Sequence, residues 1–233
     1  MSTVVVKKTS VFVIVPVKGL ANSKERLSPV LNPEERKALT AAMLENVLNA
    51  LDSSDVREVF VVSSDSNVRQ IADKHKFSHI STKRPELNPA LAEAIEWCMQ
   101  KNASSVLILP ADVPLVSPKD INRLIELGSQ EKTVVLSPSL NGGTNAILLN
   151  PPNLIPVIFG TNSFFKHVKE AINKRVTVKF HSSRELILDV DSADDLNKLL
   201  EMEDKVESKR VLKQLRISRK RELESLRSIA KET

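Results

Sequence analysis

The chain has 233 residues, 41% of them hydrophobic, and its 34 basic and 29 acidic side chains leave a net charge of +5. This length suits one soluble domain, or one domain with an appendage. The sole cysteine, Cys98, excludes an intramolecular disulfide framework and a cysteine-rich zinc or iron–sulfur site. The five glycines form neither a Walker-type phosphate loop nor a dinucleotide-binding fingerprint. Aromatic residues make up only 3% of the chain, too few for stacking on single strands, so we expect no nucleic-acid partner.

The first apolar stretch, VFVIVPV, has seven residues, whereas roughly 20 are needed to cross a bilayer. We therefore expect a cytoplasmic protein that has no signal peptide and does not bind a membrane.

The main part of the chain alternates β-branched runs with amphipathic stretches, a pattern that predicts an α/β domain with a mainly parallel sheet. Helix starts are marked by a capping side chain before a proline at Asn32-Pro33, Asn88-Pro89 and Ser117-Pro118. Further helices are predicted at 66–76, at 163–174 and from 192 onward. The predicted strands are 12–17, 58–63, 105–110, 133–137, 144–149, 176–180 and 185–190.

From residue 201 the chain carries ten basic and seven acidic residues in 33 positions. The apolar positions Leu212, Leu215, Leu223, Leu226 and Ala230 form a narrow stripe, which predicts a long amphipathic helix or a helix pair. We divide the chain into a main domain, 1–200, and a charged helical extension, 201–233. We expect the extension to dock on its own body or on a partner subunit; an RNA or membrane role is the alternative.

Ligands of open α/β sheets bind beyond the carboxyl ends of the strands, so the loops there are the candidate sites. The loop after the first strand holds Lys18, Lys24 and Arg26 within nine residues, which suits a polyphosphate, although a plain solvated basic loop is the alternative. Asp112 follows a buried strand and lies between two prolines. A carboxylate there suits Mg²⁺, and a helix cap is the structural alternative.

Two later loops offer hydrogen-bond donors. Gly142-Gly143 lets the backbone approach an anion or a base, and Thr144 and Asn145 add side-chain hydrogen bonds; a hairpin turn is compatible with the same residues. Ser163, after Gly160, is the predicted N-cap of a helix whose amino end would bind an anion. His167 lies one turn later and could lend a proton or a hydrogen bond, although a lone helical histidine is more often structural.

The stretch ILDVDSADDL places acidic residues at the end of a predicted strand and the start of a helix, where Ser192 or Asp191 can act as the cap. A second aspartate from this stretch could share Mg²⁺ with Asp112. Asp189 and Asp191 lie on the same face of a strand, so spacing does not decide between them. Two separated acids and a basic loop favour phosphate-group transfer.

The order of these motifs resembles that of the 2-phospho-L-lactate guanylyltransferase family of deazaflavin coenzyme F(420) biosynthesis. The resemblance covers roughly residues 11–200, and its specificity comes from the combination. Its motifs are VPVK-x5-K-x-RL, LNPALAEAI, PADVP, GGTNAILL, FG-x-x-SF-x-x-H and LDVDS-x-x-DL.

The resemblance implies a three-layer α/β/α nucleotidyltransferase fold of the glycosyltransferase-A kind, with a mixed, mainly parallel sheet. It implies transfer of GMP from GTP to 2-phospho-L-lactate, giving lactyl-2-diphospho-5'-guanosine and pyrophosphate, with Mg²⁺ as cofactor. The implied roles are triphosphate binding and catalysis for Lys18, Lys24 and Arg26, and the guanosine side for Asn88. Asp112 is implied to be catalytic and to bind Mg²⁺ together with Asp191. Acceptor binding is implied for Thr144, Gly160 and Ser163.

Other interpretations stay open from the sequence. Phosphoenolpyruvate or 3-phosphoglycerate could replace phospholactate as acceptor, and the chain could instead be a non-catalytic nucleotide-binding partner of another enzyme. We also expect a homodimer, with the extension enlarging the contact between subunits.

Overall fold

The computed structural model describes residues 10–20, 23–82, 84, 86–202 and 206–215. Its elements are β1 (Val11–Pro16), η1 (Glu25–Leu27), α1 (Pro33–Asp52), β2 (Glu58–Val62), α2 (Ser66–Lys74), β3 (Ser78–Ile80), α3 (Leu87–Gln100), β4 (Ser105–Ile108), α4 (Pro118–Leu127), β5 (Thr133–Pro138), β6 (Thr144–Asn150), α5 (Ser163–Asn173), β7 (Thr177–Phe180) and α6 (Ala193–Glu201).

Within the described residues seven strands form one sheet in the order β3-β2-β1-β4-β6-β5-β7. β1 pairs in parallel with β2 and β4, and β6 runs antiparallel to both β4 and β5. The predicted mixed, mainly parallel sheet is therefore confirmed. Because β6 is reversed, its first residue, Thr144, lies at the same edge of the sheet as the carboxyl end of β4.

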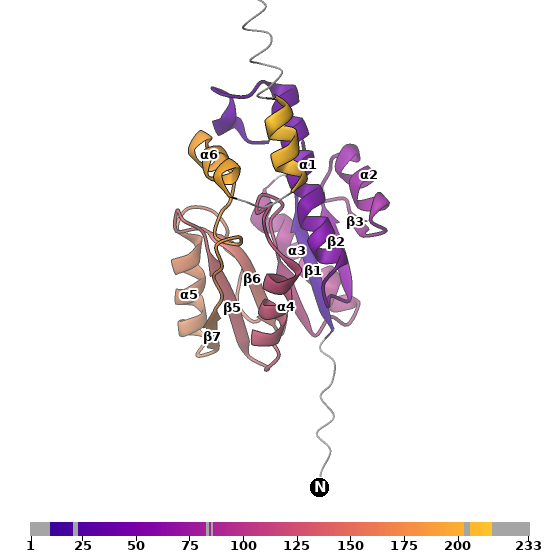
Figure 1. Cartoon of the computed structure of the whole chain (residues 1–233). Helices are drawn as coiled ribbons and strands as arrows, with labels where there is room; N and C mark the ends of the chain where they lie inside the picture. Colours follow the sequence, from indigo (N-terminus) through magenta and orange to yellow (C-terminus); the bar gives the residue numbers. More distant parts are fainter. Residues whose placement is uncertain (1–9, 21–22, 83, 85, 203–205, 216–233) are drawn as a thin grey trace, which may run out of the picture.

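Helices cover both faces of this sheet, as Figure 1 shows. Leu48 of α1, Val68 of α2 and Leu124 of α4 pack on one face, and Leu91 of α3 and Ala171 of α5 pack on the other. Successive side chains of a central strand point to opposite faces of the sheet, and both sets are buried. This explains why these strands are almost wholly apolar. The predicted three-layer α/β/α architecture is confirmed.

Local signals place most helix starts correctly. Asn32 and Ser117 accept hydrogen bonds from the amides of Glu35 and Asp120, whose carboxylates bond back to the cap amides. Ser192 forms the same reciprocal capping box at the start of α6.

Three predictions about local structure are wrong. Residues 185–190 form no strand; Leu186, Leu188 and Val190 are buried, but the amides of Leu186 and Val190 bond to Ser183 Oγ and to the Asp112 carbonyl rather than to a neighbouring strand. The caps predicted at Asn88 and Ser163 are instead Glu86 and Asn162, because the polar groups of Asn88 and Ser163 bond elsewhere in the fold. The short edge strand β3 was not predicted.

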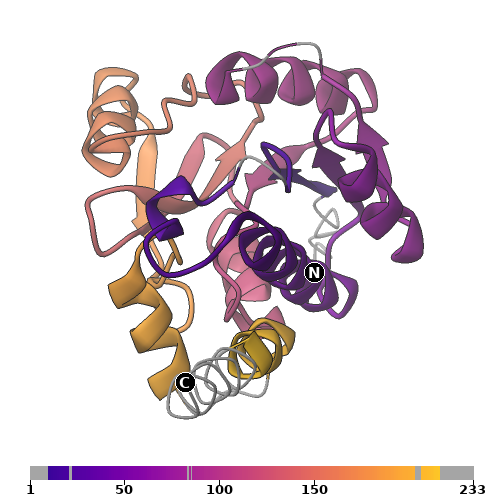
Figure 2. The ribbon, with the colours of Figure 1, turned by 90° about the horizontal axis from the view of Figure 1, so that it is seen from above.

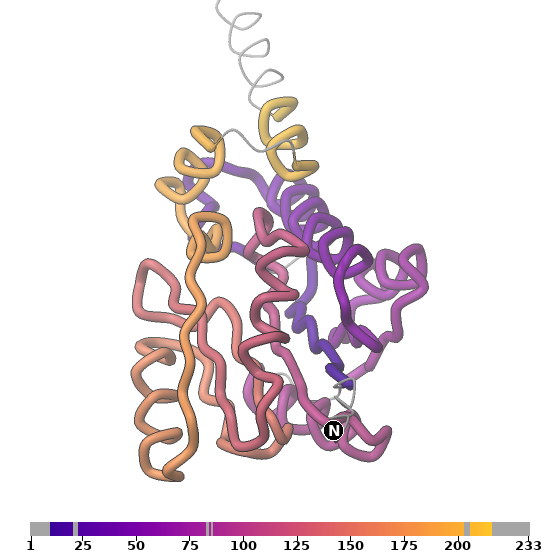
Figure 3. The backbone as a smooth tube through the Cα atoms, turned by 60° about the horizontal axis from the view of Figure 1, so that its bottom comes forward, coloured from indigo at the N-terminus to yellow at the C-terminus, as the bar shows by residue number. Residues whose placement is uncertain are grey.

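A third apolar cluster lies beyond the carboxyl end of β1, where α6 and the helical residues 207–215 lie together at the top of Figure 1. Figures 2 and 3 place residues 207–215 beside α1, where the Asn46 amide bonds to Ser208 Oγ at 2.7 Å and accepts from the Glu207 amide at 3.0 Å. Leu223, Leu226 and Ala230 of the extension lie outside the described residues. No described helix combines the length and the apolar character that crossing a bilayer requires.

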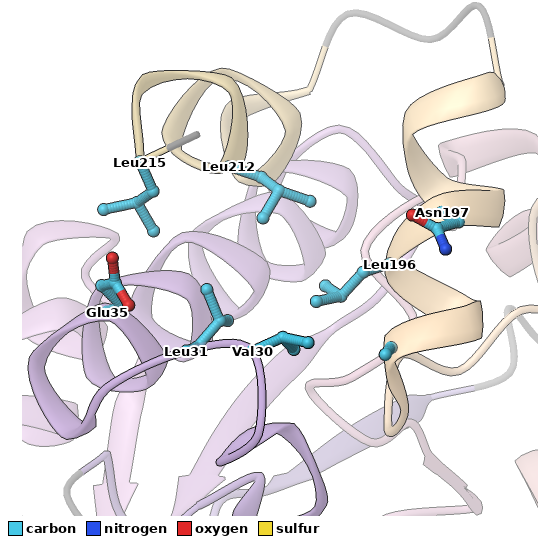
Figure 4. Close-up of a pocket in the computed structure, with 8 residues that line it drawn as sticks. Val30, Leu31, Glu35, Leu196, Asn197, Leu212 and Leu215 are labelled. Atoms are coloured by element: carbon cyan, nitrogen blue, oxygen red, sulfur yellow. The ribbon is translucent and has the colours of Figure 1, made fainter. Parts of the chain in front are cut away.

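A groove of about 250 Å³ separates residues 207–215 from α6 and the start of α1. Figure 4 shows Leu212 and Leu215 on one side of it and Val30, Leu31 and Leu196 on the other. None of the predicted site residues lines this apolar groove.

Candidate functional site

The loop after β1 follows a tight path set by an aspartate that the sequence analysis did not single out. Gly19 has a φ of 127°, a backbone conformation that favours glycine. The next amide, that of Leu20, donates to Asp65 Oδ2 at 2.8 Å, while Asp65 Oδ1 caps α2 through the Asn67 amide. Asp65 could be recognised in sequence only as a helix cap, so its second task was not visible.

Lys24 lies between the two aspartates that were predicted to bind metal. Its Nζ donates to Asp112 Oδ2 at 2.9 Å and to Asp191 Oδ1 at 2.5 Å. The lysine side chain is 9% exposed, whereas those of Asp112 and Asp191 are 30% and 39% exposed. The Val190 amide donates to the Asp112 carbonyl at 2.9 Å, and this bond brings the two acidic segments together.

The electrostatics of this cluster are dominated by its carboxylates. Burial alone would lower the pKa of Lys24, but Asp112 and Asp191 outweigh it and raise that pKa. Burial, with the charges of Asp112 and Asp191, raises the pKa of Asp189 to about 6, although hydrogen bonds to its own backbone and to the Asn145 side chain act in the opposite direction. Two carboxylates therefore share one buried ammonium, their charges also act on the Asp189 carboxyl, and the cluster attracts further positive charge.

The other two predicted cations, Lys18 and Arg26, are exposed, and neither makes an ion pair with a described residue. They belong to the same loop region as Lys24, since Arg26 lies within η1 and Lys24 is its N-cap. The Lys18 ammonium and the Arg26 guanidinium can therefore both bind an anion that arrives from solvent.

The carboxylates fit a magnesium ion in their chemistry. Mg²⁺ prefers carboxylate oxygens and takes its remaining ligands from water and substrate phosphates. Asp112 and Asp191 already hold a cationic group between them and remain partly open to solvent. No cluster of three or more acidic, histidine or cysteine side chains in the described residues forms a ready-made metal site, so one or two carboxylates with substrate oxygens suit this chain better than an all-protein cage.

The predicted acceptor residues also lie together, around His167. Ser163 Oγ donates to Thr144 Oγ1 at 3.0 Å, and His167 Nδ1 lies 3.0 Å from the same oxygen. The Ser163 amide bonds to the carbonyl of Gly160 and the Phe164 amide to that of Gly142, so these two amides at the start of α5 are already satisfied. The predicted anion site on the amino end of α5 is thus weaker than expected, and Thr144 is the better candidate.

Asn88 holds the loop that carries Gly160. Its Oδ1 accepts from the Phe159 amide at 2.8 Å and its Nδ2 donates to the Phe159 carbonyl at 3.1 Å. The side chain is therefore engaged with the protein backbone, and its role on the guanosine side stays a prediction.

Comparison with known proteins identifies the family of the chain. The sequence model described as "Guanylyl transferase CofC like" matches residues 11–231. The chain belongs to this family. The match continues past residue 200, so the extension is part of the region that the family shares.

Curated relatives cover most of the chain. A "Phosphoenolpyruvate guanylyltransferase" of Rubrobacter xylanophilus is 38% identical over 191 residues, which are 82% of this chain and 93% of the relative. A "2-phospho-L-lactate guanylyltransferase" of Methanothermobacter thermautotrophicus is 34% identical over 206 residues, 88% of this chain and 91% of the relative. This member of the guanylyl transferase family is thus an enzyme of the nucleotidyltransferase class.

Solved structures support the fold. A nucleotidyl transferase from Methanothermobacter superposes with a TM-score of 0.63 at 14% identity, covering 82% of this chain and 95% of that one. A Mycobacterium tuberculosis protein in complex with manganese superposes with a TM-score of 0.55 at 18% identity, covering 83% and 99%.

Proposed function

We propose that this guanylyl transferase family member transfers GMP from GTP to 2-phospho-L-lactate, releasing pyrophosphate, as a cytoplasmic step of coenzyme F(420) biosynthesis. The observation that carries the proposal is the Lys24 ammonium held between Asp112 and Asp191 at the carboxyl edge of the sheet. Carboxylates that converge on a cation, beside a basic loop, suit the binding of a metal and a triphosphate.

In this reaction a phosphate oxygen of the acceptor attacks the α-phosphorus of GTP. A new P–O bond forms as the bond to the β-phosphate bridging oxygen breaks, and pyrophosphate leaves with the electron pair. The nucleophile is already anionic at neutral pH, so the site needs no general base. Its task is to hold two anions together in line.

The residues of this chain divide that task. Lys18 and Arg26 are exposed cations placed to neutralise the triphosphate. Asp112 and Asp191 would hold Mg²⁺, which when bound offsets negative charge on the phosphates. The Lys24 ammonium, which lies between these two carboxylates, would add a third positive charge beside the triphosphate. Thr144, with Gly160 and Ser163 around it, would receive the acceptor.

Phosphoenolpyruvate is the second candidate acceptor, because the relative with 38% identity carries that name while the phospholactate enzyme quoted above is 34% identical. In both acids one carbon atom bears the phosphate and the carboxylate, and the two differ in the saturation and the shape of that carbon.

The test incubates the protein with Mg²⁺, each of the four nucleoside triphosphates and, in turn, 2-phospholactate, phosphoenolpyruvate and 3-phosphoglycerate. Pyrophosphate release is followed and the product identified by mass. We expect release with GTP and phospholactate. Release with phosphoenolpyruvate alone would move the protein to that acceptor, and no release with any pair would favour a non-catalytic nucleotide-binding role.

We also propose a homodimer in which the extension contributes to the contact. Light scattering of the full chain separates a dimer from the 25.9 kDa monomer. A chain shortened to residue 202 that stays dimeric would contradict the role given to the extension.

A further inference from the structure

We propose that His167 is a positioning residue that makes the Thr144 hydroxyl a hydrogen-bond donor to an anionic group of the acceptor. The inference rests on the proposed function and assigns a task to a buried histidine that the reaction itself does not use. His167 is 0% exposed, Ser163 1% and Thr144 6%.

The position of the proton on the imidazole follows from its partners. The backbone amide of Ile158 donates to His167 Nε2 at 2.8 Å. An amide N–H can only donate, so Nε2 must carry the lone pair, and a neutral ring then carries its proton on Nδ1. Nδ1 therefore donates to Thr144 Oγ1, which lies 3.0 Å away.

The ring stays neutral under physiological conditions. Burial, with a smaller contribution from the nearby charge of Lys166, lowers the pKa of His167 to about 4. A proton on Nε2 would also face the Ile158 N–H. The hydrogen bond from the Ile158 amide and the burial of the ring thus both favour the neutral form with its proton on Nδ1.

The hydroxyl of Thr144 consequently has one proton left to give. Its oxygen accepts from His167 Nδ1 and from Ser163 Oγ at 3.0 Å. A hydroxyl has two acceptor positions and one donor, so both acceptor positions are filled. No described residue is recorded as accepting the remaining proton, and a buried donor without a partner is unfavourable. The matching ligand atom is a pure acceptor, as in a carboxylate or a phosphate.

This donor lies at the reacting edge of the sheet. Thr144 is the first residue of β6, which runs antiparallel to β4, and Asp112 follows the end of β4. The next residue, Asn145, hydrogen-bonds to Asp189 of the acidic cluster. Thr144 and the carboxylates that hold Lys24 therefore lie at the same edge of the sheet.

A purely structural role for His167 would act through the loop at residues 158–160. That loop is also held by the two hydrogen bonds between Asn88 and the backbone of Phe159. Loss of the bond from Ile158 to His167 leaves those two in place, so the structural and positioning roles can be separated by substitution.

Two amide variants separate the two hydrogen bonds of the ring. In His167→Asn the Nδ2 group is as far along the side chain as Nδ1 and can still donate to Thr144. In His167→Gln the Oε1 atom can replace Nε2 and still accept from Ile158. Steady-state kinetics are measured for the wild type and both variants, with acceptor and GTP varied separately.

We expect His167→Gln to raise the KM for the acceptor by about tenfold, with the KM for GTP unchanged, because one hydrogen bond to an anion is lost. We expect His167→Asn to stay within about twofold of the wild type. Equal acceptor KM values for the two variants, or a rise in the KM for GTP of the same size, would overturn the inference.

A second pair of variants keeps the test decisive if the His167 variants unfold. Thr144→Ser retains the hydroxyl and should retain acceptor binding, whereas Thr144→Val should lose it. Unchanged acceptor KM in Thr144→Val would overturn the inference. A wild-type chain without turnover would instead overturn the proposed function, and the inference with it, so the two failures are distinguishable.

Discussion

Replacing Lys24 by methionine tests the charge balance of the acidic cluster. Methionine has a similar length and no charge, so Asp112 and Asp191 would lose the ammonium that lies 2.9 and 2.5 Å from their oxygens. At an effective dielectric constant of about 20, each such contact is worth at most about 6–7 kcal/mol before desolvation is counted. Removing one partner of a buried ion pair typically costs about 3–5 kcal/mol.

The two carboxylates are 30% and 39% exposed, so water screens part of their repulsion. We therefore expect Lys24→Met to lower the free energy of unfolding by about 2 kcal/mol in EDTA, which is a fall in Tm of about 4–8 °C for a chain of this size. Although the substitution lowers stability in EDTA, we expect it to raise the affinity for Mn²⁺. Without nucleotide the variant should bind the ion about 10- to 30-fold more tightly than the wild type, because no ammonium competes for the carboxylates.

The assay is thermal unfolding in EDTA and in Mn²⁺, together with calorimetric Mn²⁺ titration. Lys18→Met is the matched control, since it removes the same charge from an exposed side chain that makes no ion pair with a described residue. If Lys24→Met and Lys18→Met show the same Tm in EDTA and the same Mn²⁺ affinity, the reasoning is refuted.

Three further predictions concern single side chains. Asp112→Asn and Asp191→Asn should each lower pyrophosphate release at least about 100-fold, because each removes a proposed metal ligand, while the exposed Asp194→Asn should leave it unchanged. The pKa of His167 is about 4 in the folded chain against 6.5 ordinarily, so at pH 5 the unfolded chain binds a proton that the folded chain does not, and stability falls with falling pH. In urea unfolding the stability of the wild type relative to His167→Gln should drop by about 2 kcal/mol between pH 7 and 4.5, and a constant difference would contradict this. Burial raises the pKa of the Cys98 thiol to about 12, so it should react with a thiol reagent only after unfolding, and rapid labelling of the folded chain would contradict its burial.

Features that depend on neighbours in sequence were predicted well. The starts of α1 and α4 follow from an Asn or Ser, a proline and an acid three residues after the cap, because those groups satisfy one another within a single turn. The central strands follow from apolar runs, since a strand covered on both faces needs apolar side chains on both.

Features that depend on partners distant in sequence were not predicted. Ser163 and Asn88 have the residue types of helix caps, but their side chains bond to Thr144 and to the backbone of Phe159, 19 and 71 residues away. The alternating burial at residues 185–190 is the pattern of a strand, yet the Val190 amide pairs with the loop at Asp112 instead of a strand. The residue types alone cannot show whether such a group bonds within its own helix or strand or to a distant loop, because the same polar group can bond equally well to either.

Lys24 shows how a functional site differs from the sum of its predicted residues. The sequence indicates a basic loop and two acidic loops as separate ligand groups, one for phosphates and one for a metal. In the folded chain they form a single cluster, in which the lysine neutralises the carboxylates. That pairing would stabilise the metal-free protein, and a metal bound at the proposed site would compete with this internal cation. A triphosphate can offset the competition, since it supplies anionic oxygens for the released ammonium and for the metal together. We therefore expect metal and nucleotide to bind with positive cooperativity, and that cooperativity should be lost in Lys24→Met when Mn²⁺ affinity is measured with and without GTP. An equal effect of GTP on Mn²⁺ affinity in the wild type and in Lys24→Met would show that the ammonium does not couple the two.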